Sequence, residues 1–124
     1  MDETRVLIAE PEAGVARLLE VLMDRRGFAT ERAQDGAEAL RMARAGRPDL
    51  IIMDPVMSVV EGDEVLRQLR QDPDTAAIPI VLVATAEVLD TLENNGYEHV
   101  NKPFDARQLN AAIERALAAR PSGD

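Results

Sequence analysis

The chain has 124 residues, 46% of them hydrophobic, which suits one domain with one core. Its formal net charge of -9 disfavours direct binding to nucleic-acid phosphates, so we expect no nucleic-acid partner. With no cysteine and one histidine, disulfides, thiolate zinc sites, cysteine nucleophiles and His-rich metal sites are excluded. No signal peptide and no apolar run of roughly 18 residues occurs, so we expect a cytoplasmic protein without membrane contact.

Five short apolar runs alternate with helical patterns along the chain. The predicted strands are Val6 to Ala9, Phe28 to Arg32, Leu50 to Met53, Ile80 to Ala84 and His99 to Asn101. The third and fourth runs are almost entirely apolar, as expected for parallel strands that are covered on both faces. Strands that alternate with helices through short connections predict a parallel sheet with helices on both sides.

The helices between these strands have their own boundary signals. The predicted helices are Ala13 to Arg26, Asp35 to Ala45, a segment from Gly62 to before Pro73, a short one from Ala86 to Asn95, and one that begins at Asp105. The apolar stripe of the first is predicted to consist of Val15, Leu18, Leu19 and Leu22. Capping-box spacing marks the starts of the second and the last helix.

Polar side chains follow four of the predicted strands. Glu10 and Glu12 follow the first, Asp54 the third, Thr85 the fourth and Lys102 the fifth. An acid after an apolar strand is by itself a common turn or N-cap feature. In a parallel sheet, however, ligands and chemistry gather at the carboxyl ends of the strands. Acids and a lysine that converge from three strands therefore indicate a functional site.

Two stretches of the sequence resemble one known family. The segments "PDLIIMDPVMSVVEGDEVLRQLR" and "NKPF" are similar to motifs of the receiver domains of two-component response regulators, including the chemotaxis receivers. The resemblance covers essentially the whole chain. It implies a receiver domain over residues 1–120, a disordered tail over residues 121–124, and an α/β fold. The expected sheet is doubly wound, with five parallel strands in the flavodoxin-like order 2-1-3-4-5 and a short fourth helix.

The resemblance also implies a chemistry for the strand ends. Asp54 is expected to be the phospho-acceptor, and Lys102 to contact the phosphoryl group as a point charge. A hydroxyl at the end of the fourth strand is expected to bind the phosphate as well. That position falls on Ala84 when it is counted from the preceding proline, and on Thr85 after a slip of one residue. Pro103 is the candidate for a cis peptide bond.

A magnesium ion is the cofactor that the resemblance implies, with Glu10, Asp54 and the backbone of Met57 as its ligands. The family usually has two adjacent acids after the first strand, and the second of them falls here on Pro11. Either Glu12 or the longer side chain of Glu10 is a replacement ligand. Pro11 has a purely structural alternative as well, as a residue that starts the first helix.

The expected function is that of a stand-alone receiver, a signalling protein and not an enzyme, or of a fragment of a larger kinase or regulator. Its expected partners are a histidine kinase or phosphotransfer protein and a downstream protein target, reached as a monomer or weak homodimer. Thr85 and His99 are the expected switch residues. The alternative is a degenerate receiver-like module that binds partners without efficient phosphorylation. The sequence lacks the loop of a flavodoxin-like cofactor protein, the P-loop motif and a hydrolase elbow.

Overall fold

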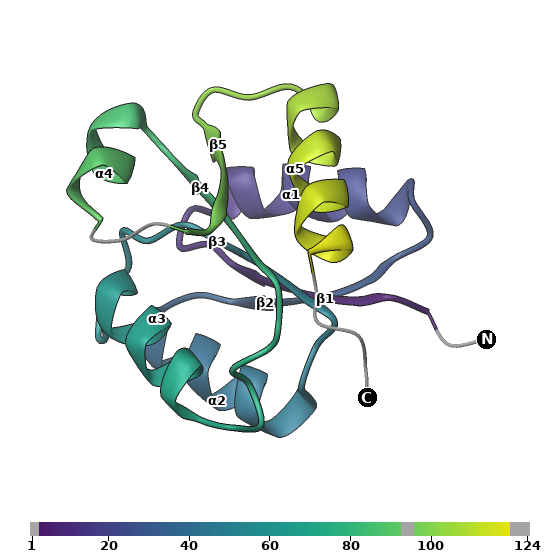
Figure 1. Ribbon diagram of the computed structural model, residues 1–124. Coiled ribbons are helices and arrows are strands. Elements are labelled where there is room, and N and C mark those ends of the chain that lie inside the picture. Colours follow the sequence, from purple (N-terminus) through teal and green to yellow (C-terminus); the bar gives the residue numbers. More distant parts are fainter. Residues whose placement is uncertain (1–2, 93–95, 120–124) are drawn as a thin grey trace.

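Five parallel strands form a single sheet in the order β2-β1-β3-β4-β5 (Figure 1). The computed structural model describes residues 3–92 and 96–119. The strands are β1 (Arg5–Ala9), β2 (Ala29–Ala33), β3 (Leu50–Met53), β4 (Ile80–Ala84) and β5 (Glu98–Asn101). The helices are α1 (Ala13–Asp24), α2 (Gly36–Gly46), α3 (Gly62–Gln71), α4 (Ala86–Thr91) and α5 (Ala106–Ala118). The predicted α/β class, strand order and short fourth helix are confirmed.

The sheet separates two apolar cores. Successive residues of β1 point to opposite faces, so that Val6 and Ile8 pack with α1 and α5, whereas Leu7 packs with α2, α3 and α4. Figure 1 shows α1 and α5 on one side of the sheet and α2 and α3 on the other. Strands such as β3 and β4 are buried along their whole length, which explains their continuous apolar sequences. Burial of each large aliphatic side chain contributes about 1.5–3 kcal/mol.

The end of α1 and the start of β2 differ from the predictions. Helix α1 ends at Asp24, because the chain turns through Gly27, which has φ 78°. Strand β2 begins one residue late, because the N–H of Phe28 donates to the carbonyl oxygen of Met23 at 3.1 Å, at the end of α1. The Phe28 ring packs against the core below α1 and α5, and its centroid lies 4.8 Å from the guanidinium carbon of Arg26. The inward position predicted for Leu18 is wrong, because this side chain is 46% exposed. The fully buried residues of α1 are instead Ala16, Leu19 and Met23.

Side-chain caps start two of the helices as predicted. The carboxylate of Asp35 accepts a hydrogen bond from the N–H of Glu38 at 2.8 Å at the start of α2. At the start of α5, Asp105 and Gln108 form both bonds of a capping box. Helix α4 begins at its N-cap Thr85, and only Leu89 of this helix is buried. The predicted end of α4 at Asn95 is wrong, because the helix ends at Thr91 and Leu92 is already extended. The predicted tail lies outside the described residues.

The loop between β3 and α3 is held closely against its neighbours. Gly62 comes so near to this loop that a Cβ atom on it would lie 2.3 Å from the carbonyl oxygen of Pro55. A Cβ atom on Gly36 would lie 1.9 Å from the carbonyl oxygen of Val60 in the same loop. Val59 has φ 68°, a left-handed conformation that a β-branched residue rarely adopts, and its side chain is 77% exposed. Backbone packing therefore fixes the course of the loop that follows Asp54.

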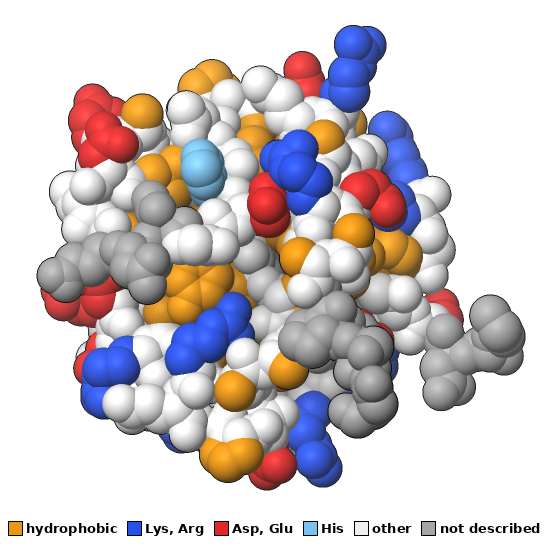
Figure 2. Space-filling model, viewed as in Figure 1, with side chains coloured by type: hydrophobic (Ala, Val, Ile, Leu, Met, Phe, Trp, Pro, Cys, Tyr) orange, Lys and Arg blue, Asp and Glu red, His pale blue; other side chains and the backbone are white. Residues whose placement is uncertain are grey.

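Acidic, basic and apolar side chains are interspersed on the face of the molecule shown in Figure 2. Several of the charges pair locally, as Glu64 and Arg67 do on α3. Within residues 3–92 and 96–119, no helix is long and apolar enough to span a membrane.

Candidate functional site

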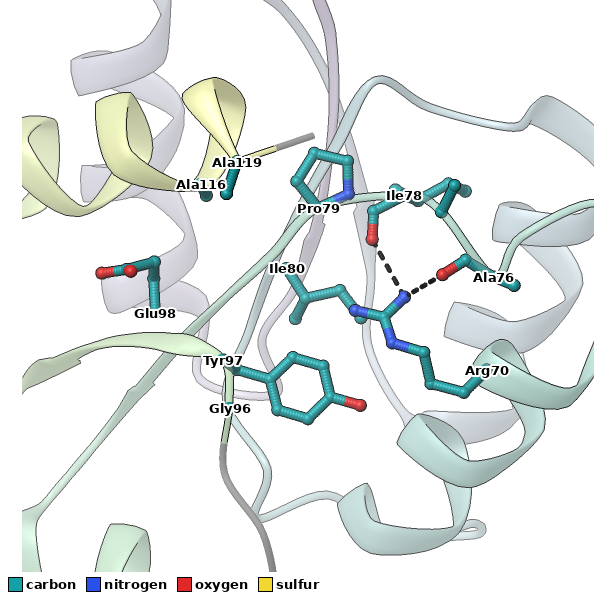
Figure 3. Close-up of a pocket in the computed structure, with 11 residues that line it drawn as sticks. Arg70, Ala76, Ile78, Pro79, Ile80, Gly96, Tyr97, Glu98, Ala116 and Ala119 are labelled. Carbon is teal, nitrogen blue, oxygen red and sulfur yellow. Dashed lines mark hydrogen bonds between the residues drawn. The ribbon is translucent and has the colours of Figure 1, made fainter. Parts of the chain in front are cut away.

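The two ends of the sheet carry side chains of different chemistry. A cavity of about 210 Å³ lies at the amino ends of β4 and β5, beside Arg70 and Tyr97 (Figure 3). The guanidinium of Arg70 donates to the carbonyl oxygens of Ala76 and Ile78 at 2.7 and 3.1 Å. Its central carbon also lies 4.9 Å from the centroid of the Tyr97 ring. Arg70 is thus engaged in holding the chain before β4, and the reactive groups lie at the opposite end of the sheet.

The sheet itself brings the polar residues together at its carboxyl edge. Strands β1 and β3 pair with Ala9 opposite Met53, which places the next residues, Glu10 and Asp54, side by side. The N–H of Asp54 continues this ladder by donating to the carbonyl oxygen of Ala9 at 3.0 Å. At the other side of β4, the N–H of Lys102 donates to the carbonyl oxygen of Ala84 at 2.8 Å. Backbone pairing therefore positions all three side chains.

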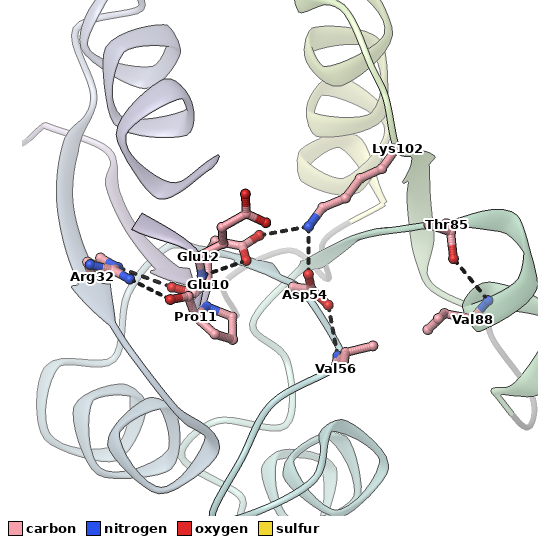
Figure 4. Close-up of polar contacts among 9 residues, drawn as sticks. All are labelled: Glu10, Pro11, Glu12, Arg32, Asp54, Val56, Thr85, Val88 and Lys102. Atoms are coloured by element: carbon pink, nitrogen blue, oxygen red, sulfur yellow. Dashed lines mark hydrogen bonds and ion pairs between the residues drawn. The ribbon is translucent and has the colours of Figure 1, made fainter. Parts of the chain in front are cut away.

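Lys102 joins the two acids (Figure 4). Its ammonium nitrogen Nζ lies 2.6 Å from Oδ2 of Asp54 and 3.2 Å from Oε1 of Glu10. Glu10 is almost completely buried at 1% exposure and Asp54 is 8% exposed. The Lys102 side chain is more open, with 21% exposure. The cluster is therefore an ion-paired triad with one negative charge in excess, reached from solvent on the side of Lys102.

The remaining oxygens of both acids accept backbone hydrogen bonds. Oε2 of Glu10 accepts from the N–H of Glu12 at 3.1 Å, and Oδ1 of Asp54 accepts from the N–H of Val56 at 2.8 Å. Each of the four carboxylate oxygens thus has a donor. These bonds also tie Asp54 to the loop before α3 and Glu10 to the turn before α1, so a change at either acid reaches the adjoining loop.

Burial and charge shift the proton affinities of two members of the triad. Burial raises the pKa of the Glu10 carboxyl above its ordinary value, and the nearby charge of Asp54 raises it further. The hydrogen bonds from Glu12 and Lys102 offset these effects only in part. For Lys102, burial alone would lower the pKa of the ammonium, but the hydrogen bond and charge of Asp54, followed by those of Glu10, raise it overall. Lys102 is therefore a permanent cation at neutral pH.

Arg32, a residue that the sequence did not single out, holds the turn after β1. Its Nε donates to the carbonyl oxygen of Glu10 at 3.1 Å, and a terminal nitrogen donates to that of Pro11 at 3.0 Å (Figure 4). The only sequence signal for this role is a cation near the carboxyl end of β2, the strand that pairs with β1. Arg32 places a second fixed positive charge next to the acidic edge.

The expected switch and hydroxyl residues lie apart from the triad. The Oγ1 atom of Thr85 accepts a hydrogen bond from the N–H of Val88 at 3.4 Å and so caps α4 (Figure 4). Ala84 is buried without a polar side-chain group, and His99 is exposed on β5. Within the described part of the chain, neither Thr85 nor His99 makes a hydrogen bond or ion pair with the triad. The peptide bond between Lys102 and Pro103 is cis.

The residues expected to bind magnesium do not form a complete set of side-chain ligands. Over residues 3–92 and 96–119, no group of three or more His, Cys, Asp or Glu side chains is placed to hold a metal ion. Glu12 is exposed. The side chain of Met57, whose backbone is the expected ligand, packs in the core beneath α2, α3 and α4. Mg²⁺ takes near-octahedral oxygen ligands, usually one or two carboxylates together with waters. Here both acids are paired with Lys102, so a magnesium ion would have to displace that ammonium.

A five-stranded parallel sheet in the order β2-β1-β3-β4-β5 is also the fold of solved receiver-type proteins. The chain belongs to the response regulator receiver domain family, whose model matches residues 6–114. It is 33% identical over 127 residues to the alkaline phosphatase synthesis transcriptional regulatory protein PhoP of Bacillus subtilis (strain 168). That match covers 97% of this chain and 52% of the relative, so the chain spans about half the length of the curated protein.

Solved structures agree with this assignment. A putative response regulator from Chloroflexus aurantiacus J-10-fl has a TM-score of 0.87 and 26% identity, over 94% of this chain and 99% of that one. The receiver domain of the sensor histidine kinase PA1611 from Pseudomonas aeruginosa PAO1 has a TM-score of 0.83 and 21% identity, over 95% of this chain and 100% of that one. That structure is described with a magnesium ion coordinated in its active-site cleft. At this identity, the second match supports the fold alone.

Proposed function

We propose that Asp54 accepts a phosphoryl group from a phosphohistidine of a histidine kinase or phosphotransfer protein. The observation that carries the proposal is the contact between Nζ of Lys102 and Oδ2 of Asp54 at 2.6 Å, at the open side of the triad. A carboxylate that attacks a phosphoryl group brings two negative charges together, and a fixed cation at the nucleophile stabilises the charge that develops. The pair lies at the carboxyl edge of the parallel sheet, where ligands bind in such folds.

In the proposed transfer, one bond to phosphorus forms as another breaks. One Asp54 oxygen forms a bond to phosphorus while the phosphorus–nitrogen bond of the donor breaks, and the donor imidazole keeps the electron pair and takes up a proton. Lys102 moves from the carboxylate oxygen to an oxygen of the new acyl phosphate. Because Oδ1 of Asp54 accepts the N–H of Val56, phosphorylation also perturbs the loop that leads to α3.

The signal is expected to leave by contact with another protein. A phosphoryl group adds about -1.5 to -2 charge and three acceptor oxygens, which attract hydrogen-bond donors from the neighbouring loops. Helix α4 starts directly after β4 with Thr85 as its cap and buries little apolar surface, so it is the element nearest to the site that moves at low cost. With a net charge of -9, this domain itself is a poor surface for DNA. A longer chain with an output domain would use the same first step.

The test is labelling by acetyl phosphate, followed by intact mass and peptide mapping. Wild-type protein is expected to gain one phosphoryl mass, with the adduct at Asp54, and Asp54→Asn to gain none. Asp63→Asn is the matched control, since it removes an exposed acid of α3 that lies outside the triad. An adduct that persists in Asp54→Asn would contradict the assignment of the acceptor.

The second candidate function is a receiver-like module that binds partners without phosphorylation. The placement of the Thr85 hydroxyl favours it, because this group caps α4 and does not face Asp54. This candidate predicts that wild type and Asp54→Asn stay unlabelled alike under conditions that label a typical receiver. Equal binding of wild type and Asp54→Asn to the same partner would further support a module that works without phosphorylation.

A further inference from the structure

We propose that the triad has no divalent-metal site and that Lys102 and Arg32 supply the positive charge at this edge of the sheet. In the unphosphorylated protein, the triad is expected to bind no divalent metal ion. The consequence, phosphorylation that does not depend on Mg²⁺, rests on the proposed function. Three features of the site lead to this inference.

The first feature is that the oxygens at the end of β1 are already engaged. The carbonyl oxygens of Glu10 and Pro11 accept from Arg32, and the two carboxylate oxygens of Glu10 accept from Lys102 and from the N–H of Glu12. A hard divalent ion would have to replace several of these donors at once. It would do so at a turn whose backbone is fixed from the β2 side.

The second feature is the position of Lys102 between the acids. Its Nζ contacts oxygens of both Glu10 and Asp54, at 3.2 and 2.6 Å, so the place where an ion would bridge these carboxylates already holds a positive charge. A divalent ion next to this ammonium would meet strong like-charge repulsion. Only one net negative charge is left among the three groups to attract it.

The third feature is the side chain of Pro11, which lies between Glu10 and Glu12 in the sequence. Pro11 has no oxygen or nitrogen in its side chain, and the carboxylate of Glu12 is exposed beyond it. Over residues 3–92 and 96–119, no three acidic or histidine side chains converge. A carboxylate at position 11 would supply the third acid, so Pro11 is the residue whose replacement should create a metal site.

Direct metal binding to the unphosphorylated chain tests the proposal. Mn²⁺ binding is measured by electron paramagnetic resonance, with isothermal titration of Mg²⁺ as a second measurement. Wild type is expected to show no saturable binding at low millimolar metal beyond that of Asp54→Asn. Pro11→Asp is expected to gain a single site, which a further Asp54→Asn substitution removes. Pro73→Asp is the matched control, because it adds the same charge at another exposed loop proline.

Saturable binding by wild type that Asp54→Asn abolishes would overturn the proposal. A Pro11→Asp variant that binds no better than Pro73→Asp would show that position 11 is not the cause. Labelling by acetyl phosphate in chelator and in millimolar Mg²⁺ then separates the two ideas. Equal labelling rates in chelator and in Mg²⁺ would support both the phosphorylation of Asp54 and the absence of a metal site. Labelling only in the presence of Mg²⁺ would support Asp54 as the acceptor but contradict the absence of a metal site. No labelling in either condition contradicts the proposed function, whatever the metal titration shows.

Discussion

Lys102 contacts Asp54 from two strands away, with its Nζ 2.6 Å from Oδ2 of the acid while β4 lies between their strands. The same ammonium contacts Glu10 at 3.2 Å, so one lysine balances acids from β1 and β3. Because both carboxylates are at most 8% exposed, water does little to screen them from each other once the lysine is removed.

We expect Lys102→Met to lower the free energy of unfolding by about 1–3 kcal/mol at pH 7, since it leaves two buried carboxylates without their cation. The loss should shrink as the pH falls through the raised pKa of Glu10 and this carboxyl takes up a proton. Urea unfolding at several pH values measures this. Arg107→Met, an exposed cation on α5, is the control and should change little. An equal loss at pH 7 and in acid would argue against charge as the cause.

Glu10→Gln is expected to change how stability depends on pH. The pKa of Glu10 is raised in the folded protein above the ordinary value of 4.5, mainly by burial, so the folded chain holds this proton to higher pH than the unfolded chain does. As the pH rises from 4.5 through the raised pKa, the wild type therefore loses stability that it has in acid. Glu10→Gln removes this loss and should be relatively more stable above that window.

The comparison for Glu10→Gln is Glu12→Gln, which removes the same charge from an exposed side chain two residues on. The stability of Glu12→Gln should depend on pH in the same way as that of the wild type between pH 4.5 and the raised pKa of Glu10. Thermal unfolding between pH 4 and 8 gives all three curves. A Glu10→Gln curve as steep as that of the wild type would contradict the assignment.

Arg32→Ala removes two hydrogen bonds from a charged donor to the backbone of the β1–α1 turn. We expect a loss of about 1–2 kcal/mol in the free energy of unfolding, with faster amide exchange around Glu12. Arg41→Ala, at an exposed position of α2, should cost less than about 0.5 kcal/mol. Exchange rates that stay unchanged at the turn would show that Arg32 does not hold it.

Gly62→Ala is expected to destabilise the fold by about 2 kcal/mol or more, because the new Cβ would lie 2.3 Å from a backbone oxygen of Pro55. Gly14→Ala, in the first turn of α1, has no atom within 4 Å of the new Cβ and should gain up to about 1 kcal/mol in stability from helix propensity. Denaturant unfolding of the two variants tests both signs. A neutral Gly62→Ala would mean that the loop after Asp54 yields easily.

Val59→Gly should stabilise the protein by about 1 kcal/mol, since glycine adopts the left-handed φ of 68° without the steric cost that valine incurs. Val56→Gly, in the same loop and 59% exposed, lacks a positive φ and should not be stabilising. The difference between the two midpoints in urea measures the strain. Stabilisation of the same size in both variants would assign the effect to lost apolar exposure.

Most of the fold follows from the sequence, because the apolar runs alternate with helical patterns and Gly27 separates the first helix from the second strand. Asp54 and Lys102 are predictable for a related reason, since the residue after a buried parallel strand must emerge at the same edge of the sheet. The inward position of Leu18 is predicted wrongly because a stripe of apolar residues on a helix does not fix which edge of the stripe faces the core.

Other features could not be predicted because they depend on backbone atoms. The guanidinium of Arg32 donates to two carbonyl oxygens in the turn, and no residue type reveals where a carbonyl oxygen points. The hydroxyl of Thr85 has two possible uses in the sequence, as a helix cap or as a group facing the acid, and the structure shows the cap. The engagement of all four carboxylate oxygens likewise depends on the N–H groups of Glu12 and Val56.

The contact of Lys102 with Asp54 crosses the end of β4, the strand that lies between β3 and β5. Adjacent strands lie about 4.8 Å apart, so the contact between Lys102, after β5, and Asp54, after β3, spans two such intervals. The contact between Lys102 and Asp54 therefore depends on backbone pairing across three strands, β3, β4 and β5, as well as on the charges of the two side chains.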